Sequence, residues 1–362
     1  MSAISALTGG VFTAAGDDDA GGLRQLVDDI GRRSFDARLG HRGPPEEFDE
    51  MLWRHIEDTG LARLSSTADL GAGPAELAIV LRGLARHAGA VPLAETDVLA
   101  AWLAGRAGLA PPTGPLTVAV GDADASGNRI RGTANDVPWT RASAAVVLAL
   151  RTSDSCHVAI ADPAEVEITD GHNLAGEPRD KIGFDLPTER FTNLDAAVAV
   201  ELLQRGAWAR CVQIIGALDA AAELSVAHTR ERVQFGRPLS KFQSVQHALA
   251  AMAGEIERAR AAATLAVAAA ADYGFGAAPT DYAVTVAKVV LGRAVSRVTT
   301  IAHQLHGAIG VTAEHPLWLF TMRAQSWVGE FGSTVQHART LGRMALSAEK
   351  PWHIVIGTNL TR

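Results

Sequence analysis

Apolar residues recur at three- and four-residue intervals through the first 110 positions, which is the period of an amphipathic helix. Two stretches show this pattern clearly, Leu23–Ile30 and Leu77–Leu84. A third amphipathic stretch runs from Phe48 to Thr59 and is followed by Gly60, a residue typical of helix ends. We therefore expect the N-terminal third of the chain to be helical.

The pattern changes beyond a linker at Pro111–Pro115, where short apolar runs, several of them rich in β-branched residues, alternate with turn-forming residues. The runs that predict strands are Leu116–Val120, Arg129–Ala134, Ala144–Leu150 and His157–Ala161. Turn-forming residues separate them, for example at Asp124–Gly127 and Asp162–Pro163. Short strands with frequent turns predict a small antiparallel barrel or sandwich.

Long helical patterns return from about Asn193. The expected helices cover residues 194–232, 242–273, 282–305 and 317–331, and a last helix starts near Ser333. Short connections containing Gly or Pro between long helices favour an antiparallel bundle. The chain is thus expected to be mainly α with a central small β domain. The predicted domains are an N-terminal α-helical domain (1–112), a middle β domain (113–192) and a C-terminal helical bundle (193–362).

The composition narrows the class of protein. The chain of 362 residues has a formal net charge of −7 with scattered Lys and Arg, which argues against nucleic acid as a main partner. Its two cysteines, Cys156 and Cys211, are far apart in sequence, so we expect neither a disulfide framework nor a structural zinc site. Residues 1–10 lack a signal-peptide pattern, and apolar stretches such as Ala261–Ala271 are too short to span a bilayer. We expect a cytoplasmic protein without membrane insertion.

An arginine stands at a predicted helix end, before a turn, in the segment Arg232-Val233-Gln234-Phe235-Gly236-Arg237-Pro238-Leu239, which Phe242-Gln243 follows. A guanidinium in this position suits a diphosphate group. The glycine permits close approach of the backbone, and the amide of Gln243 can bond an adenine or ribose edge. An arginine that merely caps a helix beside an ordinary turn is the alternative.

A second motif follows the third long helix and reads Gln304-Leu305-His306-Gly307-Ala308-Ile309-Gly310-Val311-Thr312-Ala313-Glu314-His315-Pro316. Its two glycines allow a sharp turn and leave room for a planar ligand, although a plain glycine cap is the alternative. His303 and His306 have the spacing of a metal-binding pair but lack a nearby partner carboxylate. We therefore predict no metal site.

Together these two motifs, roughly seventy residues apart, resemble those of the acyl-CoA dehydrogenase family, and the resemblance covers almost the whole chain. It implies an N-terminal α domain, a middle β domain and a C-terminal four-helix bundle, with FAD between the β domain and the bundle. It further implies that a neighbouring subunit holds the ADP half of each FAD, so that Arg232 would reach the pyrophosphate of a partner's flavin. The other residues implied to contact the adenosine end are Gln234, Phe235, Gln243, Gln304 and Gly307.

The usual catalytic base of the family is altered in this chain. Family members take the α-proton of an acyl-CoA with a glutamate while the flavin accepts a hydride. In many members this glutamate immediately precedes a Gly-Thr or Gly-Ser pair, a position that Phe331 occupies here with Glu330 adjacent. Other members place it near the position of Gly206, and Glu201 lies more than one turn earlier. Glu330 is one residue away from the usual position, and a shift of one residue in a helix rotates a side chain by about 100°. Glu330 and Glu201 are therefore only alternative candidates for the base.

The middle segment also departs from the family pattern, because it lacks a Gly-Ser-Asp loop and carries Pro138, which has no backbone donor for a flavin edge. The chain thus resembles the degenerate subunit of actinobacterial heteromeric acyl-CoA dehydrogenases, some of which degrade steroid side chains. The implied partners are an acyl-CoA substrate, a homologous subunit and an electron-transfer acceptor. One alternative is a self-sufficient homo-oligomeric enzyme that uses Glu330 or Glu201. Another is a non-enzymatic scaffold.

Overall fold

The computed structural model describes residues 18–40, 43–67, 71–152 and 154–355. Contacts between Cα atoms divide the chain into two compact units. The bundle unit contains Met1–His41, Pro74–Ala88 and Ala207–Arg362, and the sheet unit contains Arg42–Gly73 and Gly89–Gly206. Each unit combines segments that are distant in sequence, and the three consecutive domains with boundaries near residues 112 and 192 stay a prediction. Residues 1–10, considered above for a signal peptide, lie outside the described ranges.

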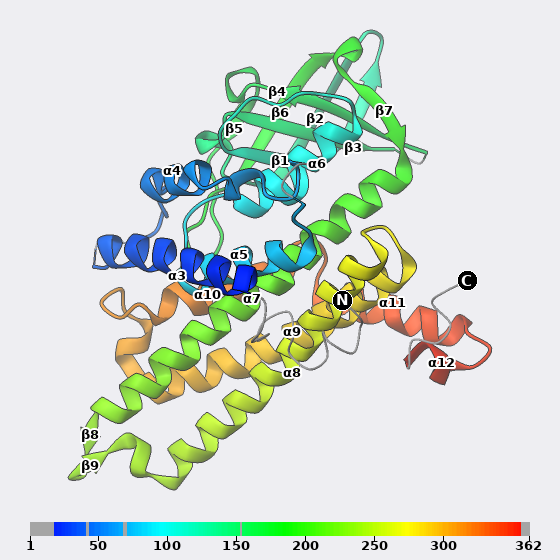
Figure 1. The fold of residues 1–362 in the computed structure, drawn as a ribbon. Helices are drawn as coiled ribbons and strands as arrows, with labels where there is room; N and C mark the ends of the chain where they lie inside the picture. The colour runs from blue at the N-terminus through cyan, green and yellow to red at the C-terminus, as the bar shows by residue number, and fades with distance from the viewer. Residues whose placement is uncertain (1–17, 41–42, 68–70, 153, 356–362) are drawn as a thin grey trace. The chain divides into compact units, whose positions relative to one another are not determined.

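The sheet unit is built on a seven-stranded mixed sheet with the strand order β5-β6-β2-β1-β3-β4-β7 (Figure 1). Its strands are β1 (Leu116–Ser126), β2 (Arg129–Pro138), β3 (Ala145–Arg151), β4 (Ser155–Ala161), β5 (Glu167–Thr169), β6 (Arg179–Pro187) and β7 (Thr192–Asp195). All four strands expected from the sequence are present. The structure adds β5, β6 and β7.

One strand pair differs from the antiparallel arrangement that the short connections predicted. β1 pairs antiparallel with β2 over Gly121–Ser126, but it pairs parallel with β3 over Leu116–Asp122. After β2 the chain passes through a 3-10 turn at Thr140–Ala142, and the Ala144 amide then donates to the Pro115 carbonyl at 2.7 Å. β3 therefore begins beside the start of β1 and runs in the same direction.

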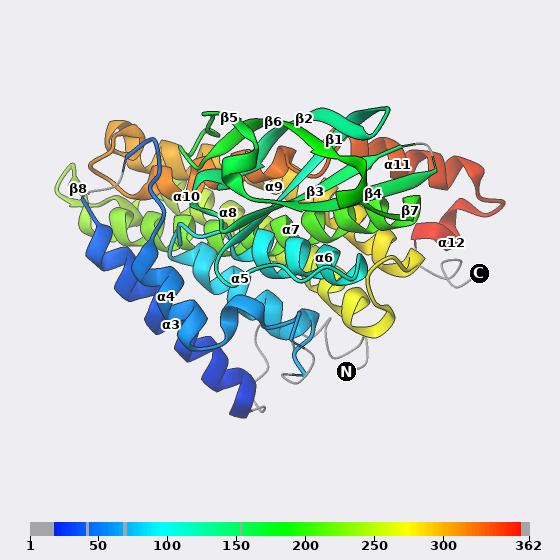
Figure 2. The same cartoon turned by 90° about the horizontal axis from the view of Figure 1, so that it is seen from above.

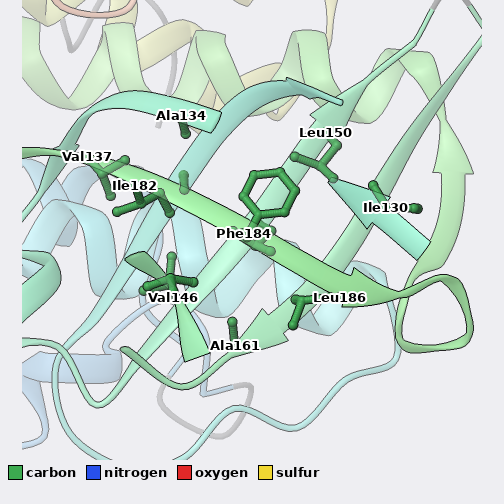
Figure 3. Close-up of a cluster of buried hydrophobic side chains, with 12 residues drawn as sticks. Ile130, Ala134, Val137, Val146, Leu150, Ala161, Ile182, Phe184 and Leu186 are labelled. Atoms are coloured by element: carbon green, nitrogen blue, oxygen red, sulfur yellow. The ribbon is translucent and has the colours of Figure 1, made fainter. Parts of the chain in front are cut away.

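Aliphatic side chains and Phe184 form the core of the sheet unit (Figure 3). Strand β3 is buried along its whole run Ala145–Leu150, which is typical of a strand covered on both faces. Strand β6 alternates instead, because Ile182 and Phe184 are buried while Asp185 is exposed. Each fully buried side chain of this size contributes about 1.5–3 kcal/mol through the hydrophobic effect.

Short helices accompany the sheet within its own unit. They are α4 (Glu50–Asp58), the π-helical segment η3 (Ala94–Ala101) and α6 (Trp102–Arg106). Asp49 caps α4 by accepting a hydrogen bond from the Leu52 amide at 2.9 Å. The helix ends at Asp58, and its C-cap Thr59 precedes Gly60 with φ of 75°, close to the end that the sequence predicted. η3 packs against β1, and α6 packs against β4.

The bundle unit consists of long helices, of which α7 begins in the sheet unit and enters the bundle unit at Ala207. The helices are α3 (Asp18–Arg38), α5 (Pro74–Arg86), α7 (Ala196–Glu231), α8 (Gln243–Tyr273), α9 (Ala278–His306), α10 (Leu317–Gly329), α11 (Thr334–Ser347) and α12 (Pro351–Val355). α8, α10 and α11 all pack against α9 (Figure 2). The five helices expected after residue 193 are confirmed to within a few residues.

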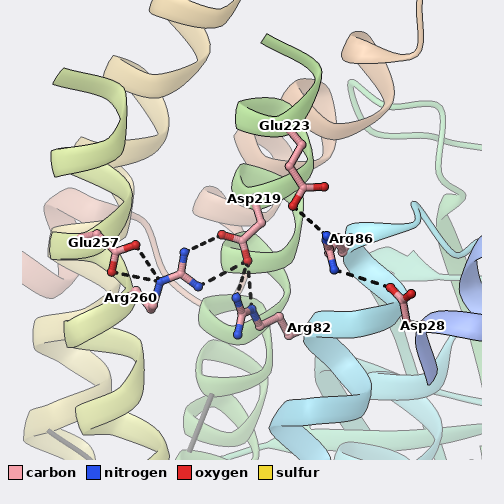
Figure 4. Close-up of polar contacts among 7 residues, drawn as sticks. All are labelled: Asp28, Arg82, Arg86, Asp219, Glu223, Glu257 and Arg260. Carbon is pink, nitrogen blue, oxygen red and sulfur yellow. Dashed lines mark hydrogen bonds and ion pairs between the residues drawn. The ribbon is translucent and has the colours of Figure 1, made fainter. Parts of the chain in front are cut away.

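Ion pairs connect three helices of the bundle unit (Figure 4). Asp219 on α7 accepts from Arg82 on α5 and from Arg260 on α8, each at 2.7 Å. Its side chain is 9% exposed, so its charge is neutralised by two guanidinium groups in a largely buried position. Arg86 also bonds Glu223 at 2.7 Å, but the Glu223 side chain is 58% exposed and this pair contributes little.

Among the described residues, α7 is the one helix long and apolar enough to cross a membrane, judged by length and composition. It is a longer candidate than the stretch Ala261–Ala271 considered from the sequence. However, 61% of its most apolar 18-residue stretch is buried inside the protein, which is typical of a core helix. Its apolar character is thus accounted for by packing.

Candidate functional site

The first sequence motif forms a short hairpin after α7. Its strands are β8 (Val233–Gln234) and β9 (Arg237–Pro238). The two residues at its tip, Phe235 and Gly236, have φ of 53° and 77°. A two-residue hairpin turn can require positive φ at both positions, which glycine adopts easily and phenylalanine rarely. The Leu239 amide closes the hairpin by donating to the Arg232 carbonyl at 2.9 Å.

The hairpin and the start of α8 present polar and aromatic side chains on the surface of the chain. Arg232, Gln234 and Gln243 are exposed. Phe235 is 91% exposed, and its ring lies edge-on to that of Phe242 with the centroids 6.2 Å apart. Exposed aromatic side chains are typical of interaction surfaces. Four of the expected cofactor-binding residues therefore lie close together on this part of the surface.

The second motif begins where α9 ends at His306. Gly307 has φ of 66°, and an added Cβ there would meet nothing within 4 Å. At Gly310, by contrast, an added Cβ would lie 2.8 Å from the Cβ of His306. The two glycines thus have different roles: Gly307 provides the left-handed backbone and leaves open space, and Gly310 permits close packing. Gln304, the remaining expected residue, is exposed and lies two residues before the helix end.

A pair of histidines brings the two motifs together. The rings of His228 and His306 are stacked with their centroids 4.5 Å apart. His228 lies one turn before Arg232 on α7, and its carbonyl accepts from the Arg232 amide at 2.9 Å. His306 directly precedes Gly307. The expected cofactor-binding residues thus come from two adjoining segments of the bundle unit.

Glu330, the first candidate base, is held by an arginine in the bundle unit. Its Oε2 accepts from Arg210 Nε at 2.6 Å, and the side chains of Glu330 and Arg210 are 19% and 3% exposed. Phe331, at the position expected for the family's glutamate, has φ of 54°, and its ring centroid lies 5.7 Å from Arg210 Cζ. The carboxylate of Glu330 is therefore engaged in an ion pair.

Lys288 lies next to this ion pair and donates hydrogen bonds to backbone carbonyls at the end of α10. Its ammonium group donates to the carbonyls of Val328 and Glu330 at 2.9 and 2.7 Å. Burial lowers the pKa of Lys288 to about 8, against the raising effects of Cys211 and Glu330. Burial also raises the pKa of the Cys211 thiol to about 12. Sequence reasoning did not single out Lys288, because a lone lysine in an apolar helix carries no motif.

Glu201, the second candidate base, is also paired, in the sheet unit. Its Oε1 accepts from Arg205 Nε at 3.0 Å, one turn along α7. The Arg205 guanidinium carbon lies 4.2 Å from the centroid of the Trp102 ring, and burial lowers the pKa of Arg205 to about 10. Both candidate carboxylates thus have arginine partners, and a catalytic role for either stays a prediction.

The segment expected to depart from the usual flavin contacts lies at the end of β2. Asp136 and Trp139 both have φ of 55°. The Pro138 carbonyl accepts from the Thr117 hydroxyl at 2.5 Å. Trp139 is 3% exposed, and its ring packs edge-on against Phe48 at 6.3 Å. These contacts fix the segment within the sheet unit and make Trp139 a core residue.

Comparisons with known proteins relate the chain to one family. The family model for the C-terminal domain of acyl-CoA dehydrogenases matches residues 196–345, which include both motifs and the segment around Glu330. Acyl-CoA dehydrogenase IpdE2 of Mycobacterium tuberculosis is 29% identical over 294 residues, or 76% of this chain and 81% of that protein. Residues 196–345 of this chain therefore match the C-terminal domain of the acyl-CoA dehydrogenase family.

Two further relatives match to different extents. IpdE2 of Mycolicibacterium smegmatis is 32% identical over 127 residues, which cover 35% of this chain and 38% of that relative. The matched part therefore spans less than half of that relative. Acyl-CoA dehydrogenase FadE27 of Mycobacterium tuberculosis is 28% identical over 338 residues, or 82% of this chain and 88% of that protein.

Solved structures of the family share the fold at lower sequence identity. The ChsE4-ChsE5 complex from Mycobacterium tuberculosis contains a chain with a TM-score of 0.80 and 24% identity, covering 93% of this chain and 99% of that one. The Tcur3481-Tcur3483 steroid ACAD gives a TM-score of 0.79 and 24% identity, covering 91% and 98%. The expected fold, mainly α with a central β domain, is confirmed.

FAD is the cofactor of this family, and a structurally similar glutaryl-CoA dehydrogenase from Mycobacterium smegmatis is in complex with FADH2. The described residues fit part of such a group. Arg232 offers an exposed guanidinium for a phosphate. At Gly236 and Gly307 an added Cβ would meet nothing within 4 Å, so a ligand can approach the backbone closely. When bound, FAD supplies the hydride acceptor.

Proposed function

We propose that this chain is a subunit of an FAD-dependent acyl-CoA dehydrogenase, which catalyses the α,β-desaturation of an acyl-CoA thioester. In this proposal the chain completes the FAD site of a partner subunit and does not supply the usual catalytic glutamate. The observation that carries the proposal is the hairpin after α7, on which Arg232, Gln234 and Phe235 are all exposed.

The chemistry of the hairpin suits the dinucleotide half of FAD. The guanidinium of Arg232 has the charge and donor geometry for a diphosphate. The amides of Gln234 and Gln243 offer both donors and acceptors to a nucleoside edge. Phe235 is exposed and has a positive φ, a backbone conformation that is unfavourable for phenylalanine. Burial of its ring by a second chain would offset this conformational cost.

The contacts of the two candidate bases support a separate source of the catalytic glutamate. A general base must be unprotonated and within hydrogen-bond reach of the proton that it abstracts. Arg210 holds Glu330, and Arg205 holds Glu201. Phe331 stands at the position expected for the glutamate and has no group that accepts a proton. We therefore assign proton abstraction to a homologous partner subunit.

Two structural neighbours bear on the kind of partner and substrate. The ChsE4-ChsE5 structure is a complex, and the Tcur3481-Tcur3483 protein is a steroid ACAD. By analogy, we propose a hetero-oligomer with a catalytic acyl-CoA dehydrogenase subunit and an acyl-CoA substrate from lipid or steroid degradation. The reduced flavin would pass its electrons to an electron-transfer acceptor.

Co-expression with candidate catalytic subunits tests the proposal. We expect native mass spectrometry and flavin absorbance to give one flavin per pair of unlike chains, with acyl-CoA bleaching the flavin of the complex. The chain purified alone should bind little flavin. If it purified alone with one flavin per chain and was bleached by acyl-CoA, the self-sufficient homo-oligomer would replace the proposal.

Arg232→Ala tests the role of the hairpin within that complex. Loss of a charge-assisted contact with a phosphate should weaken flavin retention by about tenfold or more. Arg258→Ala is the matched control, because Arg258 is another exposed arginine of the bundle unit, paired with Glu255 on α8. Equal flavin content in both variants and the wild type would favour the non-enzymatic scaffold.

A further inference from the structure

Three histidines from separate segments of the bundle unit lie close together. His228 is on α7, His306 is the last residue of α9, and His315 lies in the turn before α10. Each offers one ring nitrogen, and these atoms all lie within 4.8 Å of one another. The pair considered from the sequence, His303 and His306, is not this group, because His303 Nε2 lies 3.0 Å from Thr321 Oγ1.

The contact of His306 with the Ala302 carbonyl assigns the hydrogen of the neutral ring to one nitrogen. Its Nδ1 lies 2.8 Å from the Ala302 carbonyl oxygen, which only accepts, so Nδ1 carries the hydrogen. In the neutral ring, Nε2 therefore has a free lone pair. This atom is buried and has no hydrogen-bond partner in the part of the chain that the structure describes, and His306 as a whole is 6% exposed. An Nδ1–H bonded to a carbonyl, with Nε2 left free, is the usual state of a metal-binding histidine.

The surroundings favour the neutral, metal-binding form of all three rings. Burial lowers the pKa of His306 and outweighs the opposing effect of the Ala302 and Leu224 carbonyls. Burial, followed by the charges of His306 and Arg232, lowers the pKa of His228. Burial, with the two neighbouring imidazoles, lowers the pKa of His315 to about 4. Neutral imidazoles at close range repel one another little and offer lone pairs.

We propose that His228, His306 and His315 form a binding site for one late first-row transition-metal ion such as Zn²⁺, with a fourth position left for water or another ligand. Imidazole nitrogen is a ligand for such ions, whereas Mg²⁺ and Ca²⁺ require oxygen ligands. The Nε2 lone pair of His306, which has no donor among the described residues, would then be satisfied by the ion.

Metal binding requires small rotations of two side chains. At Zn–N distances of about 2.0–2.1 Å, the nitrogens of a tetrahedral site are about 3.3 Å apart, whereas the three ring nitrogens here lie within 4.8 Å of one another. The ring planes of His228 and His306 are 24° apart, so one ring has to turn for both lone pairs to converge. His315 Nδ1 accepts from the Leu317 amide at 3.2 Å, and binding through Nε2 would move the hydrogen to Nδ1 and break this contact.

The site would join the ends of α7 and α9 to the segment before α10. These are the segments that carry Arg232 and Gly307, so the ion would fix the surface proposed to face FAD. The inference itself depends on the geometry of the histidines and not on FAD binding. Its test can therefore fail or succeed independently of the proposed function.

Metal binding by the untagged full-length chain, stripped with a chelator, tests the proposal. We expect equilibrium dialysis against Zn²⁺ to give about one bound ion per chain, and Co²⁺ substitution to give the visible absorption of a tetrahedral site. His228→Gln and His315→Gln should each weaken binding by about tenfold or more. His247→Gln, at an exposed histidine of α8, is the matched control and should bind like the wild type.

Folding and FAD binding are separated by two further measurements. Far-ultraviolet circular dichroism should show both histidine variants folded, and Zn²⁺ should raise the melting temperature of the wild type but not of His228→Gln or His315→Gln. Arg232→Ala should bind Zn²⁺ like the wild type, whatever its flavin content. The proposal is wrong if the wild type shows no saturable binding, or if His228→Gln and His315→Gln bind Zn²⁺ as tightly as His247→Gln.

Discussion

Arg210 Nε donates to Glu330 Oε2 at 2.6 Å and thereby joins α7 to the end of α10 within the bundle unit. The Arg210 side chain is 3% exposed, so its charge depends on this carboxylate for compensation. Lys288 donates to the backbone carbonyl of the same Glu330 at 2.7 Å. Two cations therefore surround the residue that the sequence offered as a candidate base, which indicates a structural role for it.

Replacing the carboxylate of Glu330 tests that role. Glu330→Gln keeps the shape but removes the charge opposite Arg210, and we expect the free energy of unfolding to fall by about 2–3 kcal/mol. Urea unfolding followed by circular dichroism measures the change. Glu255→Gln, which breaks a more exposed pair on α8, should change stability by no more than about 0.5–1 kcal/mol. A Glu330→Gln variant that unfolds like the wild type but no longer bleaches with acyl-CoA would instead identify Glu330 as the base.

Lys288 should make stability depend on pH in the alkaline range. Burial lowers its pKa to about 8 from 10.5, so between these values the unfolded chain binds more protons than the folded one. The contribution of this group to stability is therefore fully present above pH 10.5 and is lost as the pH falls through 8. The full change corresponds to about 3 kcal/mol.

A comparison with Lys288→Met isolates this effect. The variant should be less stable than the wild type at every pH in this range, because the carbonyls at the end of α10 lose their donor, at a cost of about 1–3 kcal/mol. The difference in unfolding free energy should widen from pH 8 to 10. Cys211, whose pKa is raised to about 12, acts in the opposite direction above pH 9 but is present in both proteins. A difference that stayed constant with pH would contradict the assignment.

Gly216 on α7 marks a close approach of two helices. An added Cβ there would lie 2.2 Å from the backbone oxygen of Arg82 on α5, which cannot move without displacing that helix. Gly216→Ala should therefore destabilise the chain by about 1–3 kcal/mol. Gly254→Ala on α8 is the control, because its Cβ would meet nothing within 4 Å, and it should stabilise by up to about 1 kcal/mol. Equal thermal melting of the two variants would contradict this packing.

The helices after residue 193 were predictable because their apolar period persists over many turns and glycine or proline marks most connections. Strand β6 carries the expected alternation at Ile182 and Phe184, but charged residues and Gly183 interrupt it and obscure the pattern. The parallel pairing of β1 with β3 was not predictable, because it depends on which edge of β1 the returning chain joins.

The candidate site was predictable only where a motif carried it. Arg232 and Gly307 stand in recognisable local sequences, and the structure places both in adjoining segments. The pairing of Arg210 with Glu330 spans 120 residues, and no local pattern indicates it. The same holds for His228 and His315, which become a group only when α7, α9 and the segment before α10 pack together.

Phe235 links the conformation of the hairpin to the proposed assembly. Its φ of 53° is disfavoured for phenylalanine but tolerated by asparagine, so Phe235→Asn should leave the isolated chain as stable as the wild type or up to about 1 kcal/mol more stable. The same change removes an exposed aromatic ring, and we expect the dissociation constant for the catalytic subunit to rise about tenfold. Tyr273→Asn, at an exposed aromatic at the end of α8, should leave that constant unchanged. Titration calorimetry of the two subunits, with chemical unfolding of each variant, measures both effects. Unchanged assembly by Phe235→Asn would show that the ring is exposed for some reason other than contact with a partner.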